Sequence, residues 1–181
     1  IMGTIFVDNL EPQSGTSLTL GASGDTVSLG SGGTVTNTPA FMSRMSGDQS
    51  ISANTATKVD FDTEFFDTDS AFDISNQRFT VPSGKAGKYF FTCTLGTDDG
   101  DIDSIFVVDI RKNGSSVGES SFNRIHRTNG VLSFDAHTVI DLSAGDYIEI
   151  YARHNTAVNL QPGINSGEFR SRFSGYRLIG A

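Results

Sequence analysis

The chain has 181 residues, a formal net charge of −8 at pH 7 and a sequence pI of about 4.7. This length corresponds to one ordinary domain with an additional segment, and the acidity opposes a nucleic-acid partner, because phosphate binding depends on clustered lysine and arginine. The 20 glycines and 14 phenylalanines predict strands joined by frequent turns, and no apolar run is long enough for membrane insertion.

Residues 1–13 are expected to attach the protein to a larger assembly. The segment is more hydrophobic than a linker requires, since it contains the apolar residues Ile5, Phe6, Val7 and Leu10. The alternative is a cap strand that folds back on the segment that follows.

Residues 14–38 contain a nine-residue phrase twice, as "SLTLGASGD" at 17–25 and "TVSLGSGGT" at 26–34. Each copy predicts one short alternating strand followed by a glycine turn. Such a strand buries too little to offset an ordering entropy of about 1–2 kcal/mol per residue. The segment is therefore either a flexible linker or a stalk in which three identical chains stack their repeats around one axis. A calcium-binding nonapeptide array is excluded, because its G-G-x-G-x-D pattern does not occur.

Residues 39–181 are expected to form the main domain, and they read as strands almost throughout. The segment 58–65, "KVDFDTEF", alternates apolar with acidic residues and predicts a half-buried strand with Val59, Phe61, Thr63 and Phe65 on the core face. In "KYFFTCTL" at 88–95, Tyr89, Phe91, Cys93 and Leu95 alternate with a second face that also carries an aromatic residue, Phe90. Cys93 is expected to be a buried, inert thiol.

The later segments continue the pattern. Phe106, Val108 and Ile110 share one face of a strand that ends at Asn113–Gly114, the dipeptide best suited to a two-residue hairpin turn. The segment 147–152 buries Ile148, Ile150 and Ala152 and turns Tyr147 and Tyr151 outward. Many short strands without an amphipathic helix predict an all-β antiparallel sandwich.

Several phrases in this region, "PAFMSRMS", "AGKYFFTC", "IRKNG", "LSAGDYIEIYA" and "RFSGYRLIGA", resemble in that order the globular heads of the C1q/tumour-necrosis-factor superfamily. The resemblance implies an antiparallel jelly roll that assembles as a non-covalent homotrimer at the end of a stalk. A collagen stalk is excluded, because no G-X-Y period occurs. The N-terminal "GTIFVDNLEPQSGTSLTLGASGDTVSLGSGG" resembles the leading segment of structural proteins from tailed bacteriophages.

The sequence contains little that predicts catalysis. Ser116 lies in "GSSVG", but it follows a hairpin rather than the strand–turn–helix that a nucleophile elbow needs. His126, His137 and His154 lack the spacing of zinc ligands. Acidic residues on the 60–64 strand repeat every two residues, as on any polar strand face, and predict no glycosidase pair. We therefore expect a protein that is not an enzyme and has no required cofactor.

Two groups of residues remain as candidate sites. The acidic loop "DDGDID" is either solvated or a weak calcium site formed by Asp98, Asp99, Asp101 and Asp103. The outward aromatic residues are expected to lie in an oligomer interface: Phe90, Tyr147 and Tyr151.

The predicted function is that of a virion structural protein of a tailed bacteriophage. In this interpretation residues 1–13 bind other virion proteins, and the trimeric head projects as a fibre, capsid ornament or tail appendage that binds a host surface glycan or protein. The alternative is a secreted or cell-surface C1q-like lectin or adhesion module.

Overall fold

The computed structural model describes a head and parts of the N-terminal region. The described residues are 10–14, 18, 20, 21, 23–28, 31, 38–97, 105–118, 121–124 (backbone only), 132–162 and 171–178. The chain divides into two compact units, Ile1–Thr36 and Asn37–Ala181. The division of the N-terminal region into 1–13 and 14–38 stays a prediction.

The described part of the N-terminal unit leaves its apolar side chains exposed. Leu10, Leu18, Leu20 and Val27 expose between 44% and 60% of their surface. Gly21 and Gly24 adopt φ values of 80° and 95°, which glycine tolerates without a steric penalty. The glycine turn predicted for the first repeat is therefore confirmed, whereas the pairing of repeats between chains stays a prediction. Ile5, Phe6 and Val7 lie outside the described residues.

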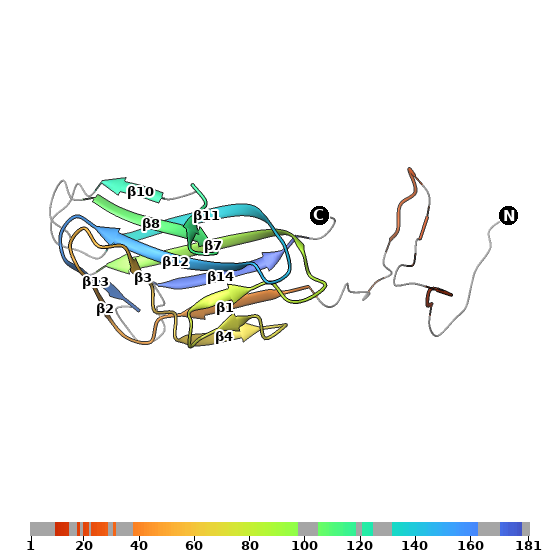
Figure 1. Cartoon of the computed structure of the whole chain (residues 1–181), viewed down its shortest axis with the longest axis horizontal. Coiled ribbons are helices and arrows are strands. Elements are labelled where there is room, and N and C mark those ends of the chain that lie inside the picture. Colours follow the sequence, from red (N-terminus) through yellow and green to blue (C-terminus); the bar gives the residue numbers. More distant parts are fainter. Residues whose placement is uncertain are drawn as a thin grey trace. The chain divides into compact units, whose positions relative to one another are not determined.

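Two antiparallel sheets build the head (Figure 1). The first, here the β7 sheet, contains β1 (Ala40–Arg44), β2 (Gln49–Ile51), β4 (Thr63–Asp67), β7 (Gly87–Thr97), β11 (Leu132–Leu142), β13 (Val158–Gln161) and β14 (Arg172–Arg177). The second, here the β12 sheet, contains β3 (Thr57–Lys58), β5 (Phe72–Asp73), β6 (Arg78–Thr80), β8 (Ile105–Lys112), β9 (Ser115–Ser116), β10 (Ser121–Arg124) and β12 (Tyr147–His154). No helix in the described part of the chain is long and apolar enough to cross a membrane.

A long strand lies at the centre of each sheet. β7 pairs with β11 along one edge and with β14 and β13 along the other, and the sheet continues from β14 through β1 to β4. β12 pairs with β8 along one edge and with β6 and β3 along the other. This arrangement confirms the predicted antiparallel all-β sandwich.

Aromatic side chains from both sheets form much of the core. The Phe41 ring on β1 lies 4.9 Å from Phe79 of the β12 sheet and 4.9 Å from Phe173 of its own sheet, centroid to centroid. Phe106 on β8 stacks on Phe134 of β11 at 4.3 Å. Stacked and edge-on rings of this kind join the two sheets more strongly than their buried area alone would.

The predicted alternation is confirmed in the long strands. The side chains expected inside on β7, β8 and β12 are all fully buried: Tyr89, Phe91, Cys93, Leu95, Phe106, Val108, Ile110, Ile148, Ile150 and Ala152. The hairpin turn is confirmed too, since Asn113 and Gly114 adopt φ values of 50° and 81°. Burial raises the pKa of the Cys93 thiol well above its usual value, so the group stays protonated.

The prediction of one strand across 58–65 is wrong. Strand β3 ends at Lys58 and belongs to the β12 sheet, where it pairs with β12. Strand β4 begins at Thr63 and belongs to the β7 sheet, where it pairs with β1, so the chain crosses between the sheets within this segment. Val59 and Phe61 are buried as expected, but Phe65 is 66% exposed. The pairing register shifts between Met42 and Ser43, so β4 carries one extra residue there. Such a bulge interrupts the alternation, and for this reason Phe65 points away from the core.

Candidate functional site

The outer face of the β7 sheet carries a row of apolar side chains across three strands. Phe90 on β7 lies opposite Val139 on β11 and opposite Tyr176 on β14. The rings of Phe90 and Tyr176 approach to 5.5 Å between centroids. Val139 and Tyr176 expose 58% and 47% of their surface, so this row faces outward without cover from the described chain.

Apolar residues also lie nearer the edge of the sheet but two positions along the strands, since Tyr176 lies opposite Ala40 and Met42 lies opposite Ser174. Met42 on β1 lies opposite Phe66 on β4, and Phe66 is 42% exposed. We call Val139, Phe90, Tyr176, Met42 and Phe66 the apolar stripe. Aromatic rings and a methionine on one sheet face are typical of an interface rather than of a solvated surface.

The same face becomes polar further along the strands. Thr94 on β7 lies opposite Asp135 on β11 and opposite Arg172 on β14. The Thr94 hydroxyl donates to Asp135 Oδ1 at 2.6 Å, and Arg172 in turn lies opposite Arg44 on β1. The outer face of the β7 sheet therefore carries its apolar residues between two polar regions, since exposed Lys88 and Asp141 lie opposite each other on the other side of Phe90 and Val139.

The structure separates the aromatic residues that were predicted to share one interface. Phe90 belongs to the β7 sheet, whereas Tyr147 and Tyr151 lie on the outer face of the β12 sheet. The Arg78 guanidinium lies 4.7 Å above the Tyr147 ring, and that of Arg111 lies 3.9 Å above the Tyr151 ring. The two tyrosines thus find cover inside the chain, while an interface role for Phe90 stays a prediction.

The remaining stripe residues were missed from the sequence, although a signal existed. In "RFSGYRLI", strict alternation places Tyr176 on the face of its strand that points away from buried Phe173. In "HTVIDL", it places Val139 on the face that points away from inward Thr138. What the sequence does not contain is the pairing of β7, β11 and β14, which aligns these residues in one row.

The groups considered for chemistry are not brought together. Ser116, on the exposed strand β9, donates a hydrogen bond from its hydroxyl group to Asp109 Oδ1 at 2.6 Å. His137 is exposed on β11, while His154 is buried on β12 with Nδ1 engaged by Thr156. His126 lies outside the described residues. Asp109 also accepts a hydrogen bond from Arg111, and no histidine in the described part of the chain forms a hydrogen bond with Ser116, so the described residues give this serine no activating imidazole.

The acidic candidates do not form a described ligand set. Asp98, Asp99, Asp101 and Asp103 lie outside the described residues, so the calcium hypothesis stays untested. Within the described part of the chain, no group of three or more histidine, cysteine or acidic side chains could hold a metal ion.

Burial opposes ionisation of Asp62, but hydrogen bonds from Ser46 and Thr63 outweigh it and lower the pKa of that carboxyl.

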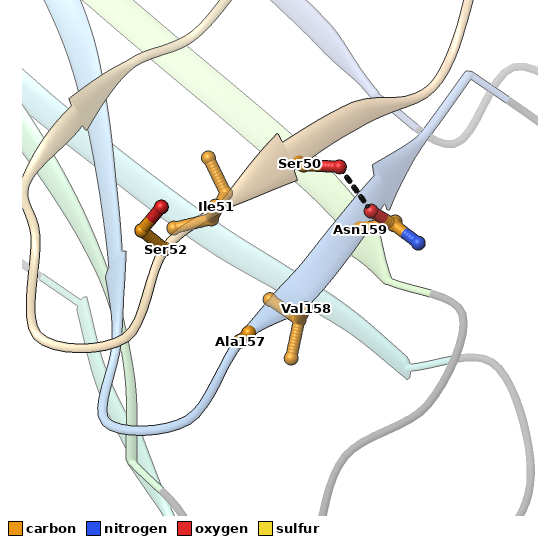
Figure 2. Close-up of a pocket in the computed structure, with 6 residues that line it drawn as sticks. All are labelled: Ser50, Ile51, Ser52, Ala157, Val158 and Asn159. Carbon is orange, nitrogen blue, oxygen red and sulfur yellow. Dashed lines mark hydrogen bonds between the residues drawn. The ribbon is translucent and has the colours of Figure 1, made fainter.

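A shallow hollow of about 190 Å³ lies between β2 and β13 (Figure 2). Its lining consists of small and neutral residues: Ser50, Ile51, Ser52, Ala157, Val158 and Asn159. The Ser50 hydroxyl donates to Asn159 Oδ1 at 2.6 Å, as the dashed line in Figure 2 marks. The hollow contains no acid, base or strong nucleophile and offers no chemistry.

Comparison with solved structures finds the same fold in three animal proteins. The globular domain of zebrafish complement 1qA protein aligns with 78% of this chain and 98% of its own at a TM-score of 0.55 and 16% identity. Eiger TNF from S. frugiperda aligns with 80% of this chain and 93% of its own at 0.53 and 13% identity. Murine APRIL aligns with 78% of this chain and 100% of its own at 0.56 and 12% identity.

At these identities the structures show the fold alone. No curated protein sequence matches the chain. The family model of the C1q domain matches residues 40–178, which include every strand of both sheets. Because this match covers most of the chain, the protein belongs to the C1q domain family.

Proposed function

We propose that this protein is a non-enzymatic binding module whose C1q domain works as a homotrimer. The observation that carries the proposal is the apolar stripe on the outer face of the β7 sheet, where Val139, Tyr176 and Phe66 expose between 42% and 58% of their surface. Soluble monomers seldom expose a contiguous apolar surface of this kind. Proteins of the C1q and TNF families form homotrimers, and a second copy of the chain is the occupant that this fold favours.

A closed, cyclic trimer would cover the apolar stripe of every protomer. In a cyclic trimer each protomer contributes one surface and receives a different one, so all three stripes are covered and no contact remains open. The stripe crosses from β11 to β4, which corresponds to about 19 Å at the usual strand spacing. Each aromatic side chain buried there would remove about 150–250 Å² from water.

The proposal predicts that a charge in the stripe disrupts assembly without unfolding the head. Val139→Asp places an unpaired carboxylate in an interface core, which typically costs at least about 2 kcal/mol. We expect a monomer with an unchanged far-ultraviolet circular dichroism spectrum in analytical ultracentrifugation.

A matched control lies two residues along the same strand. Asp141→Asn changes an exposed side chain that flanks the stripe and is expected to leave the trimer intact. Trimeric Val139→Asp protein would contradict the proposed interface, and unfolded protein would contradict the assignment of Val139 to a surface.

The finer proposal places the trimer on a tailed-phage virion through residues 1–13. It is supported by the resemblance of the N-terminal segment to phage structural proteins and by the exposed Leu10, Leu18, Leu20 and Val27. The alternative, a secreted or cell-surface adhesion module, shares the same head. Mass spectrometry of purified particles from a producing host tests the choice: absence of the chain from particles contradicts the virion role and favours the alternative.

A further inference from the structure

The outer face of the β12 sheet gathers cationic side chains around two tyrosines. Arg78 on β6 and Arg111 on β8 both lie opposite Glu149 on β12. From there they extend in opposite directions along the strand, since Arg78 covers Tyr147 and Arg111 covers Tyr151. A stacked guanidinium uses its flat face, so its N–H groups remain in the plane for other acceptors.

Two further cations complete this face. Arg153 is exposed and alternates with the buried side chains of Ala152 and His154, so it points outward. Lys58 on β3 lies opposite Tyr151. We call Lys58, Arg78, Arg111 and Arg153 the cationic face.

The carboxylates on this face leave part of the positive charge uncompensated. Glu149, almost buried, pairs with Lys58 at 2.5 Å, and Asp109 Oδ2 accepts one hydrogen bond from Arg111 Nε at 2.8 Å. Asp73 lies opposite Arg78; hydrogen bonds from Asn76 and Ser75, and then the charge of Arg78, lower the pKa of the Asp73 carboxyl.

Arg78 and Arg153 are the cations of this face without such a pair. Neither makes an ion pair within the described residues. The buried Nε of Arg78 likewise meets no acceptor in the described part of the chain. An external anion would therefore meet Arg153, which has no ion-pair partner among the described residues, and Arg78, which interacts with Asp73 but makes no ion pair there.

The spacing of the cations indicates the kind of ligand. Tyr147 and Arg153 lie six residues apart on β12, which corresponds to about 20 Å along an extended strand. Arg78 and Arg153, which make no ion pair within the described residues, with the paired cations Arg111 and Lys58 between them, match a linear polymer whose negative charges are widely spaced. Arginine binds planar or tetrahedral oxyanions through parallel N–H groups, as sulfate and carboxylate groups require. We propose that the cationic face binds an acidic polysaccharide, a saccharide chain that carries sulfate or carboxylate groups.

A nucleic acid fits this face less well. Duplex DNA carries one charge per about 1.7 Å of axis, which four cations over about 20 Å neutralise poorly. Single strands bind mainly by stacking bases on open aromatic rings, whereas Arg78 and Arg111 already cover Tyr147 and Tyr151. The overall charge of −8 adds long-range repulsion.

The proposal deepens the proposed binding function and rests on it, but uses a different sheet from the apolar stripe. The test measures binding of the full-length chain to dextran sulfate by biolayer interferometry, with uncharged dextran and a single-stranded DNA oligonucleotide of similar length as comparisons. We expect the chain to bind dextran sulfate but neither dextran nor the oligonucleotide. The affinity for dextran sulfate should fall as NaCl rises from about 0.1 to about 0.5 M.

Three variants locate the site. Arg78→Gln/Arg111→Gln is expected to lower the affinity for dextran sulfate by about tenfold or more, because two charge-assisted contacts are lost. Arg153→Gln alters one exposed residue with little risk to the fold and is expected to lower the affinity by about threefold. The matched control, Lys88→Gln/Arg172→Gln, removes two exposed charges from the β7 sheet; compared with wild-type protein of the same mass by light scattering, it is expected to change the affinity by less than about twofold.

Several outcomes would overturn the assignment. They are a wild-type chain that does not bind dextran sulfate, arginine variants that bind as the wild type does, and a control that loses as much affinity as the double variant. Equally tight, arginine-dependent binding of the oligonucleotide would make the face a general polyanion site and overturn the choice of saccharide. Light scattering on the same samples separates the two proposals, since a monomer that binds dextran sulfate contradicts only the trimer and a trimer that does not bind contradicts only the site.

Discussion

At some positions in the head, close contacts that the sequence does not reveal determine which amino acid fits. Gly175 on β14 lies opposite Phe91 and Phe41 on its two neighbouring strands. A Cβ atom at position 175 would lie 2.3 Å from Phe91 Cδ1 and 3.0 Å from the Phe90 carbonyl oxygen. The glycine is required because a fully buried ring occupies the space of a side chain.

Gly175→Ala is therefore expected to destabilise the head. The added methyl group must displace Phe91 within a packed core, which typically costs about 1–3 kcal/mol. Denaturant unfolding followed by circular dichroism measures the change. Gly47→Ala is the matched control, because a Cβ there meets no atom within 4 Å, and its unfolding free energy should change by less than about 1 kcal/mol. Equal stability of the two variants would contradict the packing described for Gly175.

Asp146 connects the β8–β9 turn to the turn before β12. Its carboxylate oxygens accept hydrogen bonds from Asn113 Nδ2 and Ser143 N, each at 2.8 Å, and Lys112 Nζ lies 2.8 Å from Oδ2. Lys112 first, and then Asn113 and Ser143, lower the pKa of Asp146 from 3.8 to about 2. The folded state therefore favours the charged form.

A lowered pKa in the folded state adds stability above the unfolded value of 3.8, and this stability is lost as the pH falls through about 2. We expect Asp146→Asn to be less stable than the wild type at neutral pH and the difference to shrink between about pH 4 and about pH 2. Urea unfolding across this range measures it. A difference that is independent of pH, or that grows on acidification, would contradict the linkage to Asp146.

At the scale of elements, β4 shows where the alternation of apolar and polar residues fails to predict strand bounds and side-chain orientation. The runs in β7, β8 and β12 are regular, so period-two alternation identifies their buried faces. The 58–65 run alternates just as well, yet the chain crosses between sheets inside it and carries a bulge at its end. Crossing points and bulges depend on partner strands far along the chain, which local periodicity does not encode.

The candidate surfaces show the same limit. The outward orientation of Tyr147 and Tyr151 follows from β12 alone, but their arginine cover comes from β6 and β8. Likewise Phe90 was identified from its own strand, whereas the rest of the apolar stripe depends on the pairing of β7 with β11 and β14. The sequence thus predicts which side chains point outward but not which of them meet.

Ser43 holds the start of β4 against β1 and gives a test of this junction. Its side chain is fully buried, and its hydroxyl lies 2.9 Å from the Thr63 carbonyl oxygen and 3.3 Å from that of Phe61. Ser43→Ala leaves these acceptors without the donor and is expected to cost about 1–3 kcal/mol.

The effect of Ser43→Ala should appear first as faster amide hydrogen exchange in 61–67. Ser50→Ala, which removes an exposed hydroxyl bonded to Asn159, is the control and should leave exchange in this segment unchanged. Unaltered exchange in Ser43→Ala protein would contradict the role given to the hydroxyl.

At the scale of the whole molecule, the two outer faces of the head have different characters. The β7 sheet presents the apolar stripe and suits contact with a second copy, whereas the β12 sheet presents the cationic face and suits a charged ligand. A trimer in which the surface that receives the stripe is not the cationic face leaves that face exposed on each protomer. Three weak sites on one particle then bind a polymer with an avidity that a single site cannot reach.

The mass of the full-length chain in solution tests the central claim, assembly as a homotrimer, most directly. Multi-angle light scattering at micromolar concentration is expected to give three times the chain mass of 19.3 kDa, about 58 kDa, without a concentration-dependent fall towards the monomer. A single species of 19.3 kDa across this concentration range would contradict the claim.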